Sequence, residues 1–276
     1  KETVNIVYPE LKNKIDKLST WQSDAFIKWQ DDNFCGVIQA VTGTGKTKVA
    51  LSAVRAFIGM KRDLRILILV PSVVLLEQWK AAIWKDLGFE ITSMLGGGYG
   101  NKPDLTSPIT IGVVNTVSSM AEDYNEYFDV LIADECHRYA AKSFSKALFT
   151  HANYRMGLTA TLERSDEGVK NVLLPYFTGI SKDYDYEQAK KDKVIAPYGV
   201  ACIGVNLLDE EQAEYDISGN IMQKANYLLI KKYGYPKSFG EFIAKANQAY
   251  NQGGEERDLT QKYLSALQKR LSLIHI

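Results

Sequence analysis

The sequence predicts an α/β fold in which a parallel sheet is the middle of three layers, followed by a helical C-terminal segment. Up to about residue 205, short apolar runs alternate with segments of helical periodicity, and polar clusters directly follow several runs. Beyond residue 205 only helical patterns remain. Strands separated by helices are typical of parallel βαβ units with both sheet faces covered.

The apolar runs and their turn residues define the expected elements of the sheet. We expect strands over residues 35–41, 65–70, 109–114, 128–133 and 155–158. A helix is expected from about Lys46 to Ile58, and another where Val74, Trp79 and Ile83 recur at helical spacing. Because ligands of such sheets bind beyond the carboxyl ends of the strands, the polar clusters there are the candidate sites.

The part after residue 205 predicts helices alone. Ile217, Ile221, Ala225 and Leu228 share one face of the first helix, which Gly234 and Pro236 end. Further helices are expected over residues 239–250 and 259–271. We therefore expect a domain boundary near residue 205, dividing 1–205 from 206–276.

Charge and cysteine content restrict the class of protein. The 276 residues carry 33 basic and 33 acidic side chains, so any nucleic-acid contact must be a local patch. Cys35, Cys136 and Cys202 form no CxxC pair, which argues against a disulfide framework or a zinc site and is typical of reduced thiols. No apolar run could span a bilayer, and no signal peptide opens the chain. These features predict a cytoplasmic protein without membrane contact.

A glycine-rich segment between an expected strand and helix predicts a phosphate-binding loop. It reads Val41-Thr42-Gly43-Thr44-Gly45-Lys46-Thr47. Its backbone N–H groups can surround phosphate oxygens, and the helix N-terminus adds the positive end of its dipole. Lys46 would reach the β and γ phosphates of ATP, and the Thr47 hydroxyl would bind Mg²⁺. Ala40 stands where the strict pattern has glycine, and an ordinary glycine-rich turn is the alternative.

Two adjacent carboxylates follow the expected strand 128–133. Asp134 and Glu135 are electrostatically unfavourable neighbours unless a cation is close, and a Mg²⁺–phosphate complex would supply one. Asp134 would hold Mg²⁺ through water, and Glu135 would accept the proton of the attacking water. The alternative is an acidic N-cap for the next helix. Taken alone, His137 would be a packing or surface residue and Cys136 buried filler.

The combined segments resemble the motifs of superfamily 2 helicases and translocases. Residues 40–47 are similar to motif I, where alanine is common at the first position, and residues 134–137 are similar to motif II in its DExH form. Residues 157–161 (Gly-Leu-Thr-Ala-Thr) resemble motif III, while residues 18–22, 70–72 and 115–116 resemble the adenine-recognition segment and motifs Ia and Ib. The resemblance covers about residues 15–205 and implies the N-terminal RecA-like lobe of a P-loop NTPase.

The resemblance also implies a role for each matching residue. Gln22 would contact adenine, and Thr42, Gly43, Thr44, Gly45, Lys46 and Thr47 would bind the triphosphate. His137, Thr159 and Thr161 would couple the ATP site to the nucleic-acid site. Pro71, Ser72 and Thr116 would lie against the sugar–phosphate backbone, which positions a protein without reading sequence. The glycines at 96–98 are either a further phosphate cradle or a flexible loop, and Trp79 is expected in the core.

The segment 157–166 is similar to the branch of repair helicases and restriction-enzyme motor subunits. That branch implies DNA, with duplex favoured and RNA as the alternative, and a nuclease or methylase as a candidate partner subunit. The family's second RecA-like lobe supplies an arginine at the ATP site, and no matching segment follows residue 205. We expect a truncated gene, since the hexapeptide at 271–276 equals one frame of a common sequencing adapter. A genuine helix end is the alternative.

The leading functional prediction is an ATP-dependent DNA helicase or translocase, of which this lobe alone would be nearly inactive. The alternative from another class is a nucleotide-dependent DNA-binding module without motor activity. A P-loop kinase or switch ATPase needs neither motif III nor the Gln22 segment, which argues against it.

Overall fold

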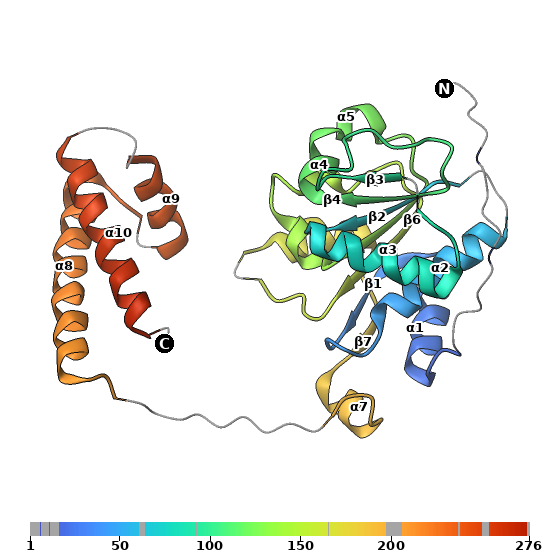
Figure 1. The fold of residues 1–276 in the computed structure, drawn as a ribbon, viewed down its shortest axis with the longest axis horizontal. Coiled ribbons are helices and arrows are strands. Elements are labelled where there is room, and N and C mark those ends of the chain that lie inside the picture. Colours follow the sequence, from blue (N-terminus) through green and yellow to red (C-terminus); the bar gives the residue numbers. More distant parts are fainter. Residues whose placement is uncertain are drawn as a thin grey trace. The chain divides into compact units, whose positions relative to one another are not determined.

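The computed structural model describes Ile6, Leu11 and residues 17–60, 64–91, 93–164, 166–196, 206–236, 238–249 and 254–274. The chain forms two compact units, Lys1–Tyr198 and Gly199–Ile276 (Figure 1). The boundary expected at residue 205 falls in the stretch 197–205, outside the described residues.

A seven-stranded sheet forms the middle layer of the first unit, and each described strand pair is parallel. The strand order is β3-β4-β2-β5-β6-β1-β7. The bounds are β1 Cys35–Ala40, β2 Ile66–Val70, β3 Ser93–Leu95, β4 Ile109–Val113, β5 Val130–Asp134, β6 Tyr154–Thr159 and β7 Ile180–Tyr184. The predicted three-layer parallel sheet is confirmed, and β3 and β7 are strands that the sequence pattern did not predict.

Helices cover both faces of this sheet (Figure 1). One apolar cluster joins the sheet to α1 Thr20–Asp31, α2 Lys46–Gly59, α3 Val73–Leu87 and α7 Tyr186–Lys191. The other face packs against α4 Val114–Ser119, the 3-10 turns η1 Cys136–Ala140 and η2 Ser145–Ala147, the π turn η3 Val169–Leu173 and α6 Leu174–Phe177. The short helix α5 Ala121–Tyr124 follows α4 directly.

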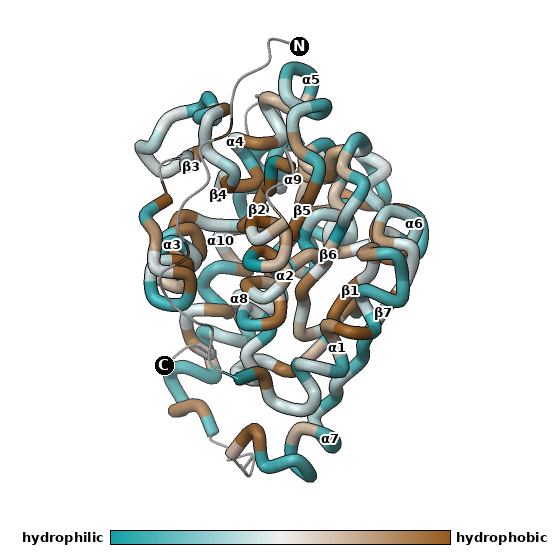
Figure 2. Tube along the Cα trace, turned by 90° about the vertical axis from the view of Figure 1, so that its right-hand side faces the viewer, coloured by the Kyte–Doolittle hydropathy of each residue, from teal (hydrophilic) through white to brown (hydrophobic). Residues whose placement is uncertain are grey.

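Alternation along the strands explains why both faces are covered. In β2, Ile66, Ile68 and Val70 belong to one apolar cluster, while Leu67 and Leu69 belong to the other. All five residues are buried. Figure 2 shows hydrophobic colouring along the central strands. A strand with two apolar faces needs a helical layer on each side, which sets the three-layer architecture.

The second unit is a helical hairpin with an additional helix. Its helices are α8 Asp209–Tyr233, α9 Phe239–Ala249 and α10 Glu255–Ile274. Gly234 ends α8 with a left-handed φ of 62°, as predicted. Its core contains Ala225, Leu229, Tyr235, Phe242, Ala246 and Tyr263. The predicted apolar face of α8 is only partly right, because Ile217 and Ile221 are 60% and 41% exposed.

None of the helices described here combines the length and the apolar character that crossing a membrane requires.

Candidate nucleotide and coupling site

The glycine-rich loop turns between β1 and α2 at the carboxyl edge of the sheet. Gly43 and Gly45 have φ values of 84° and 87°, which residues with a side chain rarely adopt. A Cβ on Gly45 would lie 2.6 Å from Nε2 of Gln22, whereas one on Gly43 would meet no atom within 4 Å. The loop is therefore tightly packed against Gln22 at Gly45, and it faces open space at Gly43.

Gln22 fastens α1 to this loop. Its side-chain amide donates hydrogen bonds to the carbonyls of Thr44 and Gly45 at 3.1 and 3.3 Å, and its Oε1 accepts one from the Ser19 N–H at 3.0 Å. Gln22 is buried, so these bonds replace its contacts with water. The amide supports the loop in this structure, and its contact with adenine stays a prediction.

The Lys46 ammonium lies between the loop and the acidic pair. It donates a hydrogen bond to the Ala40 carbonyl at 2.6 Å. Burial lowers the pKa of Lys46, and the negative charges of Glu135 and Asp134 raise it. Coupling to both carboxylates requires that the three groups be close. Two segments 88 residues apart in sequence, counted from Lys46 to Asp134, therefore converge at one point.

Parallel pairing explains this convergence. Strand β6 lies between β1 and β5, with Leu158 in register with Ile38 on one side and Asp134 on the other. The carboxyl ends of the three strands therefore lie side by side. This arrangement brings together the loop after β1, the acidic pair after β5 and the threonines after β6.

The Asp134 carboxylate is held by two donors. Its Oδ1 accepts the Glu135 N–H at 3.0 Å, and its Oδ2 accepts the indole N–H of Trp79 at 2.8 Å. Asp134 is only 9% exposed, and burial raises its pKa. Trp79 is 2% exposed, so the expectation of a core residue is correct, yet its polar contact was not predicted from the sequence.

Glu135 adopts a left-handed conformation with a φ of 51°, unusual for a residue with a side chain. It occupies the N-cap position of η1, but its side chain makes no capping hydrogen bond. The alternative of an acidic N-cap is therefore met in position, but without the hydrogen bond that a capping side chain makes. Its carboxylate lies 3.4 Å from Nδ1 of His137.

A hydrogen-bonded chain links the acidic segment to the segment after β6. Thr159, which is fully buried, donates its hydroxyl hydrogen to the Thr161 carbonyl at 2.7 Å, and its Oγ1 lies 2.9 Å from Nδ1 of His137. Because a hydroxyl has one hydrogen, this network assigns the proton at this contact to Nδ1 of His137. Burial lowers the pKa of His137. The three residues predicted to couple the sites are thus brought into contact.

Arg164 extends this chain and was not assigned a role from the sequence. Its Nη1 donates to the His137 carbonyl at 2.8 Å, while Nε and Nη2 hold both oxygens of Asp166 at 2.7 and 2.6 Å. This bidentate pair lowers the pKa of Asp166 to about 2. Separation by 27 residues hides the contact to His137 from any local pattern.

The residues predicted to contact nucleic acid lie at the start of α3 and in α4. Ser72 is the N-cap of α3 and accepts the Leu75 N–H at 3.4 Å. Thr116 lies in α4, and a Cβ on Gly96 would be 2.8 Å from its Oγ1. A Cβ on Gly97 would be 2.7 Å from Cγ1 of Val73. Residues 96 and 97 therefore pack against Thr116 and against Val73 at the start of α3. Pro71 and Ser72 directly precede Val73 in the chain.

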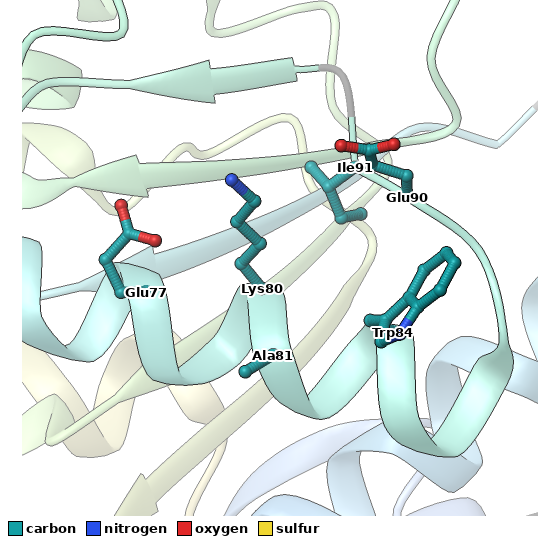
Figure 3. Close-up of a pocket in the computed structure, with 6 residues that line it drawn as sticks. All are labelled: Glu77, Lys80, Ala81, Trp84, Glu90 and Ile91. Atoms are coloured by element: carbon teal, nitrogen blue, oxygen red, sulfur yellow. The ribbon is translucent and has the colours of Figure 1, made fainter.

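A shallow pocket of about 380 Å³ lies on the outer side of α3, away from these groups. It is lined by Glu77, Lys80, Ala81, Trp84, Glu90 and Ile91 (Figure 3). Trp84 is 61% exposed there, in contrast to buried Trp79 on the same helix. The two tryptophans of α3 thus occupy opposite environments.

The arrangement defines a class of protein, and known structures share its fold. The chain resembles the Hef helicase domain of Pyrococcus furiosus with a TM-score of 0.53 and 15% identity, over 93% of this chain and 59% of that one. It resembles the DNA-bound restriction-modification enzyme LlaBIII with a TM-score of 0.52 and 21% identity, over 65% of this chain and 16% of that one. Among curated proteins, it is 34% identical to the "DNA 3'-5' translocase XPB2" of Sulfurisphaera tokodaii over 213 residues.

That match covers 77% of this chain and 45% of the translocase, so the chain spans less than half of that relative. The family model described as "Type III restriction enzyme, res subunit" matches residues 11–164, and the chain belongs to this family. It is the N-terminal RecA-like lobe of a superfamily 2 helicase or translocase, from the branch that includes repair helicases and restriction-enzyme motor subunits.

Proposed function

We propose that this lobe binds Mg–ATP and drives a DNA helicase or translocase. The observation that carries the proposal is the convergence of Lys46 with Asp134 and Glu135 beside an open glycine loop. Two carboxylates against one ammonium leave net negative charge, which suits a divalent cation. The similar proteins include a DNA translocase and a DNA-bound restriction-modification enzyme, which supports DNA as the track and a nuclease or methylase as a partner.

The residues at the site fit Mg²⁺ and a triphosphate. No group of three or more His, Cys, Asp or Glu side chains gathers as a metal cage in the described ranges. Mg²⁺ with nucleotides needs none, because one or two protein oxygens and the phosphates suffice. Thr47 and Asp134 would hold the ion, which would neutralise charge on the phosphates. Residues 42–47 would bind the triphosphate, and Gln22 the adenine.

The catalytic roles follow from the chemistry of the side chains. Lys46 would balance negative charge on the transferred phosphoryl group, and Glu135 would accept the proton of the attacking water. The chain from His137 through Thr159 to Thr161 would report the state of the ATP site to the DNA surface at Pro71, Ser72 and Thr116. We further propose that the intact protein has a second lobe and that this chain alone hydrolyses ATP very slowly. The proposed location is the cytoplasm.

The test measures ATP hydrolysis by the full-length gene product with and without duplex DNA. We expect DNA to stimulate hydrolysis, and Lys46→Ala or Glu135→Gln to abolish it. A supplied arginine accounts for about 10³–10⁵ in rate in related systems, so this chain alone should be slower by a factor of that order. Nucleotide-dependent DNA affinity without DNA-stimulated hydrolysis would instead establish the non-motor binding module. Hydrolysis by the isolated chain at the full-length rate would refute the need for a second lobe.

A further inference from the structure

The contact between Trp79 and Asp134 has a chemical consequence beyond packing. Trp79 lies on the inner side of α3, belongs to the core beneath the sheet edge, and is 2% exposed. A buried indole N–H needs an acceptor, and the acceptor here is a carboxylate rather than a backbone carbonyl. Packing here requires the volume of the ring system but not its N–H.

The bond also decides which way the carboxylate faces. With Oδ2 bound to the indole and Oδ1 to the Glu135 N–H, both oxygens of Asp134 have a fixed donor. Each oxygen keeps a further lone pair, so the group can still accept a hydrogen bond from a metal-bound water. Without the indole N–H, a buried anionic oxygen would lose its partner, which is costly. The carboxylate would then turn toward other donors, and the Lys46 ammonium is close.

We propose that Trp79 is a positioning residue for Mg²⁺, which orients the Asp134 carboxylate before the metal–nucleotide complex arrives. The inference rests on the proposed nucleotide site. Partners that orient metal-binding side chains typically contribute about 10- to 100-fold in metal affinity. Trp79 would act through Asp134 and would not touch the nucleotide.

The experiment titrates Mg²⁺ into the 276-residue chain with a fluorescent ATP analogue and follows nucleotide binding by anisotropy. Trp79→Phe removes the N–H and some volume. A second variant carries β-(3-benzothienyl)alanine at position 79, which keeps the indole shape and replaces the N–H with sulfur. The matched control is Trp84→Phe, the same change on the outer side of the same helix, where the side chain lines the pocket in Figure 3. Circular dichroism checks that each variant folds.

We expect both changes at position 79 to lower the apparent Mg²⁺ affinity by about 10- to 100-fold, and Trp84→Phe to leave it unchanged. In an Asp134→Asn background the changes at position 79 should have no further effect, because the group that they position is gone. Should Trp79→Phe fail to fold, the sulfur variant decides.

Two outcomes overturn the inference. Wild-type Mg²⁺ affinity in the sulfur variant would show that the N–H does not position the carboxylate. An equal loss with and without Asp134→Asn would show that Trp79 acts only on the fold. If the unsubstituted chain binds no nucleotide in a Mg²⁺-dependent way, the proposed function itself fails, and this inference with it.

Discussion

Replacing Thr159 with valine should show whether its hydroxyl couples the proposed ATP and DNA sites, because the substitution keeps the packing of the side chain. Valine has nearly the shape of threonine, so Thr159→Val removes the hydroxyl from a fully buried position and little else. The hydroxyl donates to the Thr161 carbonyl at 2.7 Å and lies 2.9 Å from His137. Its oxygen also accepts the Thr161 N–H in a longer contact of 3.3 Å. A hydrogen bond contributes about 0.5–1.5 kcal/mol net, so losing the two shorter bonds should cost about 1–3 kcal/mol, and the longer third bond adds little.

The unit that contains Thr159 has about 200 residues, and in that size range 1 kcal/mol shifts Tm by about 2–4 °C. We therefore expect Tm to fall by about 4–8 °C for a loss of about 2 kcal/mol, measured by circular dichroism in the isolated chain. In the full-length protein, DNA should no longer stimulate ATP hydrolysis, while nucleotide binding persists.

The matched control is Thr161→Val, two residues along. Thr161 is exposed, and its hydroxyl accepts the Glu163 N–H at 3.1 Å, where water can replace it. This variant should lose less than about 0.5 kcal/mol. Equal Tm shifts for the two variants would refute the reasoning, and so would full DNA stimulation in Thr159→Val.

Three further predictions concern the loop and the acidic segment. Gly45→Ala should destabilise the chain by about 1–2 kcal/mol more than Gly43→Ala. Both glycines adopt positive φ, but only a Cβ at Gly45 would meet the Gln22 side chain. Denaturant unfolding measures both losses, and equal losses would contradict the close approach. Burial raises the pKa of the Asp134 carboxyl above its ordinary value, so stability should fall as pH rises through the pKa of the folded state; Asp134→Asn should remove this part of the slope in unfolding measured from about pH 4 upward, and an unchanged slope would assign it to another group. Burial lowers the pKa of His137 below its ordinary value of 6.5, so as pH falls the unfolded chain takes up the proton before the folded chain does. The free energy of unfolding should therefore fall as pH drops through 6.5. His137→Gln should flatten that slope in unfolding measured between about pH 5 and 8. A slope that is unchanged in the variant would place the titration elsewhere.

The central strands could be predicted from sequence because both of their faces are buried. The run at 66–70 has no polar residue to interrupt it, so its pattern is unmistakable. Strand β7 at 180–184 was missed because only two of its residues, Ser181 and Tyr184, are buried, without regular alternation, and because it contains Lys182 and Asp183. Strand β3 has three residues, which is too short for any periodicity.

The loop and acidic pair could be predicted because their residues are contiguous. Contacts between segments that are distant in sequence could not be predicted, because no local sequence pattern indicates them. Trp79 meets Asp134 across 55 residues, and Arg164 meets the His137 carbonyl across 27. In the second unit, helical periodicity identified α8 but misjudged its buried face, since Ala225 and Leu229 form the core while Ile217 is exposed.

The left-handed backbone at Glu135 sets chemistry against conformation at a single position. A side chain in that region costs about 1–2 kcal/mol, and glycine would remove the cost. Selection for stability alone would therefore favour glycine at this position. Under the proposed role of Glu135 as proton acceptor, relatives that hydrolyse ATP should keep glutamate despite this conformational cost, and relatives that have lost hydrolysis should be free to replace it.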